Sequence, residues 1–211
     1  MPGNPRENLA SRGVYLGNFV KLALIGTHGA GKTTIAYEIC SLLKRSGQNV
    51  ELVREVARRS LFPVNADTTL EGQLWILHTQ IAAELEAARG APNVVCDRSV
   101  LDNYCYLVNK FGRQPQLEQW LLWWMETYDL LVGISPIAEP IIRDGFRSED
   151  CEFQRRIDEL LKKILQEAPF DALRDRVLWM DGPDRGQWAE RIFAVAFPAV
   201  HAPDSAKRSA R

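Results

Sequence analysis

Short apolar runs alternate along this 211-residue chain with longer stretches in which apolar residues recur every three or four positions. Five runs have the length and composition of buried strands, at 19–25, 49–53, 93–97, 129–134 and 176–180. The helical period covers 34–44, 70–89, 100–111, 115–126, 150–167 and 185–197. Strands that alternate with helices pair in parallel, and helices then cover both faces of the sheet. The pattern therefore predicts an α/β protein with three layers, α/β/α, around a mostly five-stranded parallel sheet.

Two of the predicted helices begin with a capping pattern, in which a Ser or Thr is followed three residues later by an acid. Thr68 with Glu71 predicts the first of these starts, and Ser99 with Asp102 predicts the second. Gly112 ends the second of the two helices. Both helices are therefore expected to have defined N-terminal ends.

The length suits one domain with ample material for a buried core. We predict a domain over 18–198, preceded by a flexible segment at 1–17 and followed by a disordered tail at 199–211. The N-terminal segment lacks the apolar core of a signal peptide, and no apolar run is long enough to span a membrane. Four cysteines without metal-binding spacing are typical of reduced thiols. These features predict a cytoplasmic protein without a membrane partner.

The net charge of the chain bears on one class of function, nucleic-acid binding. The chain has 26 Lys and Arg residues against 27 Asp and Glu residues, so its formal net charge is −1. A dedicated nucleic-acid surface would be basic, and this balance does not favour one.

The strongest motif in the chain is 26–33, with the sequence G-T-H-G-A-G-K-T. It matches the P-loop pattern G-x-x-x-x-G-K-[ST] and lies between a predicted strand and a predicted helix, as a phosphate-binding loop does. We expect the nucleotide to be bound by Gly26, His28, Gly29, Ala30, Gly31, Lys32, Thr33 and Thr34. Lys32 should reach the β- and γ-phosphates of ATP, and the Thr33 hydroxyl should ligate Mg²⁺. His28 is expected at the loop tip, without a catalytic role.

Two further strands end in charged residues. Asp97 can hold the shell of the Mg²⁺ ion or accept a hydroxyl proton, and Arg98 can bind a phosphate or substrate oxygen. Glu55 is interpreted either as a general base or acceptor ligand, or as the partner of Arg58 or Arg59 in an ion pair. Because ligands bind beyond the carboxyl ends of parallel strands, these residues and the P-loop should converge on one site.

Weaker signals lie elsewhere. The loop 139–150 contains Arg143 and Arg147, which can close over a triphosphate and neutralise charge on the transferred phosphoryl group, or can be solvated. Gln80 is interpreted equally as a ligand of a nucleobase-like ring and as a solvated helix residue. The three tryptophans of 115–126 favour core or lid packing over substrate stacking. Asp181, after the fifth strand, should join the common site.

Together, the P-loop, 54–58, 97–103 and the Arg-rich loop resemble P-loop small-molecule kinases, which have an AAA-type ATP-binding domain. The similarity is greatest to the branch of bacterial ribosylnicotinamide kinase domains, with thymidylate and deoxynucleoside kinases as neighbours. It runs from about 20 to 197. The resemblance implies a P-loop NTPase fold with an Arg-rich lid, and it implies ATP and Mg²⁺ as cofactors.

The resemblance also implies roles for single residues. Lys32 and Thr33 would handle ATP and Mg²⁺, and 181–183 would lie near the adenine ring. Further roles would fall to Asp97 or Glu55 as base or organiser of Mg²⁺, Arg98 as ligand of phosphate or acceptor, and Arg143 and Arg147 as lid residues. Deoxynucleoside kinases usually have Glu in place of Asp97 and Pro in place of Val56, so the acceptor stays open.

The leading hypothesis is an ATP- and Mg²⁺-dependent kinase that transfers the γ-phosphate to a small acceptor, foremost a nucleoside or nucleotide. One alternative is a 5′-hydroxyl polynucleotide kinase, which the near-zero net charge does not favour. Another is a P-loop ATPase or GTPase with a regulatory role, although the guanine-reading pattern Asn-Lys-x-Asp is incomplete at 109–112. The sequence also leaves open whether the protein forms a homodimer.

Overall fold

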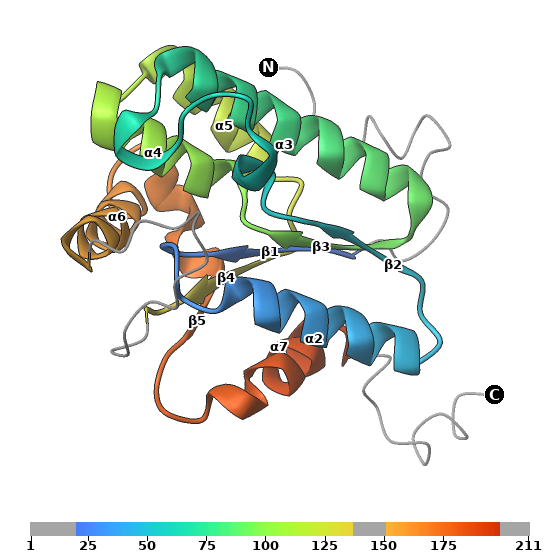
Figure 1. The fold of residues 1–211 in the computed structure, drawn as a ribbon. Coiled ribbons are helices and arrows are strands. Elements are labelled where there is room, and N and C mark those ends of the chain that lie inside the picture. Colours follow the sequence, from blue (N-terminus) through green and yellow to red (C-terminus); the bar gives the residue numbers. More distant parts are fainter. Residues whose placement is uncertain (1–19, 137–150, 199–211) are drawn as a thin grey trace.

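The computed structural model describes residues 20–136 and 151–198 (Figure 1). The predictions for 1–17 and for 199–211 lie outside the described residues, as does the loop with Arg143 and Arg147. The roles of these segments therefore stay predictions.

A single five-stranded parallel sheet forms the centre of the molecule. Its strands are β1 (Val20–Ile25), β2 (Val50–Val53), β3 (Asn93–Asp97), β4 (Leu130–Ile134) and β5 (Val177–Met180). They are arranged in the order β2-β3-β1-β4-β5, and every neighbouring pair is parallel. The predicted sheet is confirmed, because each predicted strand differs from the observed one by no more than one residue at its start. The strand with the P-loop occupies the centre.

Helices cover both faces of the sheet, as Figure 1 shows. On one face lie α3 (Leu70–Gly90), α4 (Val100–Phe111) and α5 (Pro115–Met125), with α6 (Cys151–Ile164) packed against α4. The other face holds α2 (Lys32–Arg45) and α7 (Trp188–Ala196). Short 3₁₀ helices complete the described chain, namely η1 (Val56–Arg59), η2 (Asn65–Asp67), η3 (Phe170–Arg176) and η4 (Arg185–Gln187). The predicted α/β fold with three layers is therefore observed.

The core divides at the sheet because successive side chains of a strand point to opposite faces. In β1, Leu22 and Leu24 pack with the residues of α2 and α7, whereas Ala23 and Ile25 pack with those of α3 to α6. All four are fully buried. A strand that is buried on both faces is apolar throughout, which explains the continuous apolar run in the sequence.

Helix starts agree with the capping predictions in one case out of two. The capping box of Ser99 and Asp102 is present at the start of α4. The prediction for Thr68 is wrong, because Thr69 is the N-cap of α3 and its side chain accepts a hydrogen bond from the amide of Gly72. The Thr68 hydroxyl instead accepts a hydrogen bond from the Gln73 side chain. The last predicted helix begins as η4 and continues as α7.

A buried charge pair beneath α5 shows that the tryptophans of this helix pack in the core. The ammonium group of Lys21 lies 2.5 Å from a carboxylate oxygen of Glu84 and 4.7 Å from the centre of the Trp124 ring. The indole N–H of Trp124 donates to Glu84 as well. Trp120 and Trp123 pack against the same core cluster. Core packing of these tryptophans is therefore confirmed. Among the described helices, none combines the length and the apolar character needed to cross a membrane.

Candidate active site

The P-loop connects the end of β1 to the start of α2, and its first glycine is required by sterics. Gly26 has a φ of 143°, and a Cβ atom there would lie 2.6 Å from the carbonyl oxygen of Ile134. No other residue type avoids that contact. Gly31, with a φ of 83°, turns the chain into the helix. The loop therefore surrounds a small cavity, the phosphate cradle, which is lined by 28–33 together with Glu55, Asp97 and Arg98.

Lys32 bends back over the loop. Its ammonium group donates hydrogen bonds to the carbonyl oxygens of Gly26 at 2.8 Å and of Thr27 at 2.5 Å. The residue is only 4% exposed. Burial, aided by the charge of Arg98, lowers the pKa of Lys32 to about 8 from its ordinary 10.5. A phosphate group in the cradle would offer the ammonium group an anionic partner and so favour its charged form.

Thr33, in the first turn of α2, and Asp97, the last residue of β3, are in contact. The Thr33 hydroxyl donates to Oδ2 of Asp97 at 2.6 Å. Burial raises the pKa of the Asp97 carboxyl, although the charge of Lys32 acts in the opposite direction. One hydroxyl and one carboxylate are ligands that suit Mg²⁺, which takes its remaining oxygens from waters and substrate phosphates. The residues present therefore fit the predicted metal site.

Asp102 joins the P-loop to the start of α4. Its Oδ1 accepts a hydrogen bond from the Gly26 amide at 2.8 Å. Its Oδ2 accepts from the amide and the hydroxyl of Ser99, at 2.9 and 2.8 Å. Sequence reasoning assigned Asp102 to helix capping alone and missed this second contact. A capping box uses only one carboxylate oxygen of Asp102, and the unused second oxygen was the only hint in the sequence of a further hydrogen bond.

Glu55 lies between two arginines. Its Oε1 pairs with Nε of Arg98 at 2.7 Å, and its Oε2 pairs with Nε of Arg58 at 2.8 Å. Burial alone would raise the pKa of Glu55, but the charges of Arg98, Lys32 and Arg58 outweigh it and hold the pKa at about 2. The predicted ion pair with Arg58 is therefore confirmed, and a second pair with Arg98 accompanies it.

Arg98 adopts an uncommon backbone conformation with a φ of 92°. Its guanidinium group lies 5.2 Å from the centre of the Tyr106 ring. One of its terminal nitrogens, Nη1, is buried and has no hydrogen-bond partner among the described residues. A buried guanidinium donor without a partner is suited to an anionic ligand.

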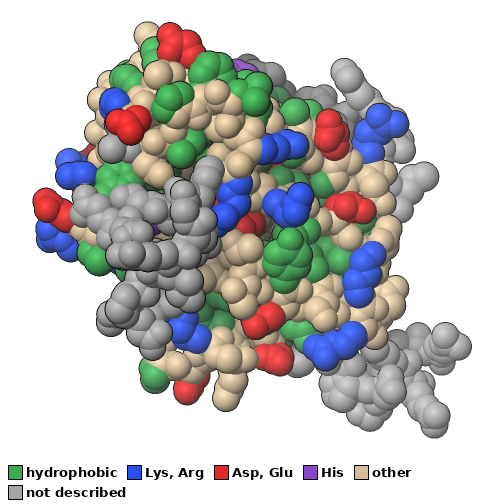
Figure 2. All heavy atoms as spheres, in the orientation of Figure 1, with side chains coloured by type: hydrophobic (Ala, Val, Ile, Leu, Met, Phe, Trp, Pro, Cys, Tyr) green, Lys and Arg blue, Asp and Glu red, His purple; other side chains and the backbone are tan. Residues whose placement is uncertain are grey.

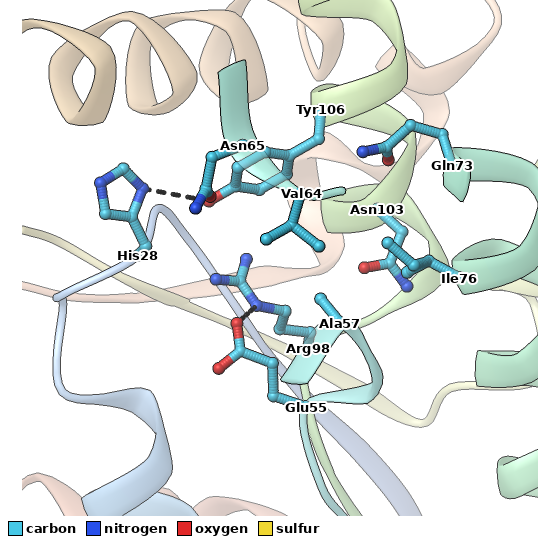
Figure 3. A pocket seen from close by; sticks show the side chains of 10 residues that line it. All are labelled: His28, Glu55, Ala57, Val64, Asn65, Gln73, Ile76, Arg98, Asn103 and Tyr106. Carbon is cyan, nitrogen blue, oxygen red and sulfur yellow. Dashed lines mark hydrogen bonds and ion pairs between the residues drawn. The ribbon is translucent and has the colours of Figure 1, made fainter. Parts of the chain in front are cut away.

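Above the Glu55–Arg98 pair lies a cavity of about 30 Å³ that is only partly open to solvent, called the enclosed cavity below. Figure 3 shows side chains from the P-loop, the segment after β2, α3 and α4 pointing towards one another around it. Within the described part of the chain, Oε1 of Gln73 and Nδ2 of Asn103 are buried there without a hydrogen-bond partner. The cavity therefore presents one acceptor and one donor in addition to the charged pair. Sequence reasoning missed Gln73 and Tyr106, which belong to no motif, and it named Asn103 only as part of the segment 97–103.

His28 corrects one sequence prediction. It lies within the P-loop, but it is buried at 4% exposure and lines both the phosphate cradle and the enclosed cavity, which a loop-tip position did not indicate. Its Nδ1 lies 3.2 Å from the hydroxyl oxygen of Tyr106, as Figure 3 shows. The start of α6 causes the burial, because Gln154 donates to the His28 carbonyl oxygen and the Phe153 ring lies 5.5 Å from the imidazole ring.

Three other predicted residues lie away from these cavities. Gln80 is fully buried, and its amide donates to Glu84 and to the carbonyl oxygen of Arg98, so the interpretation as a solvated helix residue was wrong. Thr34 is exposed on α2 and does not line the phosphate cradle. Asp181 is exposed after β5 and lines neither the phosphate cradle nor the enclosed cavity. Instead, Arg185 of η4 donates to the carbonyl oxygen of Ala30.

Solved structures with the same fold include a deoxyadenosine kinase and NadR. The deoxyadenosine kinase of M. mycoides with bound dATP superimposes with a TM-score of 0.57 at 19% identity, over 83% of this chain and 98% of that one. NadR in complex with NR has a TM-score of 0.65 at 22% identity, over 84% of this chain and 51% of that one. NadR with NAD and AMP-PNP has a TM-score of 0.62 at 18% identity, over 88% and 51%. The chain thus spans about half the length of NadR, and at these identities the likeness shows the fold alone.

No curated protein matches the chain. A family model described as an AAA domain does match it, over residues 21–183. The matched region contains the P-loop, the Thr33–Asp97 contact and the Glu55–Arg98 pair. Because this match covers most of the chain, the protein belongs to this family of AAA domains.

Proposed function

We propose that this protein is an ATP- and Mg²⁺-dependent kinase that transfers the γ-phosphate to a hydroxyl group of a small acceptor, foremost a nucleoside or nucleotide. The proposal rests mainly on one observation. The phosphate cradle and the enclosed cavity are adjacent and share His28, Glu55 and Arg98. A donor phosphate and an acceptor hydroxyl bound in the two cavities would meet beside these side chains, as positioning for in-line transfer requires.

On the nucleotide side, the amides of the P-loop and the N-terminus of α2 would hold the phosphates. Lys32 would exchange its bonds to the Gly26 and Thr27 carbonyl oxygens for phosphate oxygens. Thr33 and Asp97 would hold Mg²⁺, which supplies neutralisation of charge on the phosphate oxygens when bound. Arg98 would direct its unpartnered Nη1 donor at the transferred phosphoryl group.

On the acceptor side, Glu55 would accept a hydrogen bond from the attacking hydroxyl. A carboxyl group with a pKa of about 2 is a weak base, so its main contribution is to orient the hydroxyl and not to remove its proton early. Loose phosphoryl-transfer transition states need little help from a base. Gln73 and Asn103 would bind a polar edge of the acceptor.

A cavity of about 30 Å³ is smaller than a nucleoside, so the acceptor needs additional space. The segment 56–67, which contains η1 and η2, supplies the wall residues Val64 and Asn65. It also exposes Leu61, at 86%. Outward movement of this segment is the change that would admit the acceptor.

The test is phosphoryl transfer from ATP with Mg²⁺ to nucleosides, nucleoside monophosphates, nicotinamide riboside and a short 5′-hydroxyl oligonucleotide, with products identified by mass spectrometry. We expect one small acceptor class to be phosphorylated well above the background of ATP hydrolysis. The variant Lys32→Ala should be folded and inactive. Tight ATP binding without transfer to any of these acceptors would overturn the proposal.

A further inference from the structure

An open cleft of about 760 Å³ runs along the outer edge of β2 between α2 and α3. Because β2 is an edge strand, no neighbouring strand fills this space. The cleft borders the candidate active site, since Thr33, Asp97 and Glu55 contribute to its wall. Among the described residues, Glu55 is the one that lines both the cleft and the enclosed cavity, so the two are separate spaces.

Three arginines within six positions line this cleft, namely Arg54, Arg58 and Arg59. Arg58 is engaged by Glu55. Arg54 and Arg59 are exposed, and no hydrogen bond or ion pair holds their guanidinium groups within 20–136 and 151–198. Figure 2 shows Lys and Arg side chains gathered around the centre of the face that it draws. A cleft with several available guanidinium groups is suited to bind a phosphate group.

The other walls of the cleft are different in character. Tyr37 of α2 contributes an aromatic ring and is 50% exposed. Ala83 and Ala87 keep the α3 side free of bulky side chains. Glu51 and Glu86 also line the cleft. An anion would therefore be bound at the arginines and not along the whole cleft, while an attached planar ring could stack on Tyr37.

We propose that the cleft is a second ligand site that binds a nucleoside monophosphate, with the phosphate on Arg54 and Arg59 and the base against Tyr37. The site has a consequence for Glu55 that rests on the kinase function proposed above. A phosphate that also attracts Arg58 weakens the ion pair between Arg58 and Oε2 of Glu55. That carboxylate oxygen then becomes available to the acceptor hydroxyl. Occupation of the cleft would thus promote transfer in the neighbouring site.

The experiment is equilibrium dialysis of labelled AMP against the full chain, with the P-loop saturated by Mg²⁺ and a non-hydrolysable ATP analogue. We expect saturable binding of AMP, and binding of adenosine at least about tenfold weaker because it lacks the phosphate. Arg54→Ala and Arg59→Ala should each weaken AMP binding about tenfold. Arg45→Ala, an exposed arginine at the end of α2, is the matched control and should leave the affinity unchanged.

A second pair of variants separates this site from the enclosed cavity. Gln73→Ala and Asn103→Ala alter only the enclosed cavity and should leave the AMP binding that depends on Arg54 and Arg59 unchanged. If these variants weaken AMP binding while Arg54→Ala and Arg59→Ala do not, the proposal is overturned. Equal affinities for adenosine and AMP overturn it as well. The readout is binding alone, so a failure of the proposed kinase activity would be seen separately, in the transfer assay.

Discussion

The amide of Gly26 donates its hydrogen bond to Asp102, 76 positions later in the chain. Asp102→Ala removes this anchor of the P-loop and the bonds to Ser99. We expect nucleotide affinity to fall about tenfold or more and the free energy of unfolding to fall by about 2–4 kcal/mol. Calorimetric titration with ADP and urea unfolding measure the two quantities.

Ser99→Ala is the matched control for this prediction. It removes the capping hydroxyl but leaves the bond between Gly26 and Asp102 in place. Loss of a cap costs about 1 kcal/mol of stability, and nucleotide affinity should hardly change. Equal nucleotide affinities of wild type and Asp102→Ala would show that the loop keeps its shape without this anchor.

The ion pair of Glu55 and Arg98 predicts a specific dependence of stability on acid. The folded-state pKa of Glu55 is about 2, below its ordinary 4.5, so its stabilising contribution is complete above pH 4.5 and is lost as the pH falls towards 2. Glu55→Gln should cost about 3 kcal/mol at neutral pH, because Arg98 is left buried without its partner. Urea unfolding between pH 2 and 7 should show the difference between the two proteins shrinking below pH 4.5.

Glu159→Gln serves as the control for that series. Glu159 pairs with Arg155 at the surface, at 3.4 Å, and surface pairs contribute little. Its effect should therefore be small at every pH. A difference between wild type and Glu55→Gln that does not change with pH would contradict the assignment of the acid response to Glu55.

Nucleotide binding should take up protons near pH 8. The pKa of Lys32 is about 8 because burial and the charge of Arg98 disfavour the ammonium form, and phosphate would raise it again. At pH 8 the uptake should approach about half a proton per site. Titration calorimetry of ADP binding in two buffers of different ionisation enthalpy measures this quantity. Lys32→Met should abolish the uptake; proton release by the wild type would contradict the sign.

His28 should affect the acceptor more than ATP. Its ring lies in the enclosed cavity with Nδ1 beside the Tyr106 hydroxyl. His28→Ala is expected to raise KM for the acceptor about tenfold while KM for ATP changes little. His28→Asn should recover part of the loss, because its amide occupies the position of Nδ1. A rise confined to KM for ATP would place the role of His28 in the phosphate cradle instead.

The strands and the P-loop could be predicted because their signals are local. A strand buried on both faces is apolar throughout, as in β1, and a phosphate loop needs glycines at fixed positions. The proximity of Thr33 and Asp97 also followed, since the P-loop that leads to Thr33 begins at the carboxyl end of β1 and Asp97 ends the parallel strand β3.

The rest depends on how distant elements pack. Nothing in the sequence near Glu55 indicates that β2 lies beside β3, which brings the carboxylate to Arg98. His28 was misplaced because its burial comes from α6, more than 120 positions later. Gln80 was misjudged for the same reason, since its partner Glu84 is buried by Lys21 and α5. These are tertiary contacts without a local signature.

The φ of 92° at Arg98 is a conformational cost located at the candidate active site. Glycine adopts such a conformation at no steric cost, whereas arginine does so at the expense of stability. Replacing Arg98 by glycine would relieve this strain, but it would leave Glu55 without its partner and would delete the guanidinium group from both cavities that it lines. The strained backbone at this turn is therefore tied to the charged pair, and a stability-driven redesign of this protein should leave Arg98 untouched.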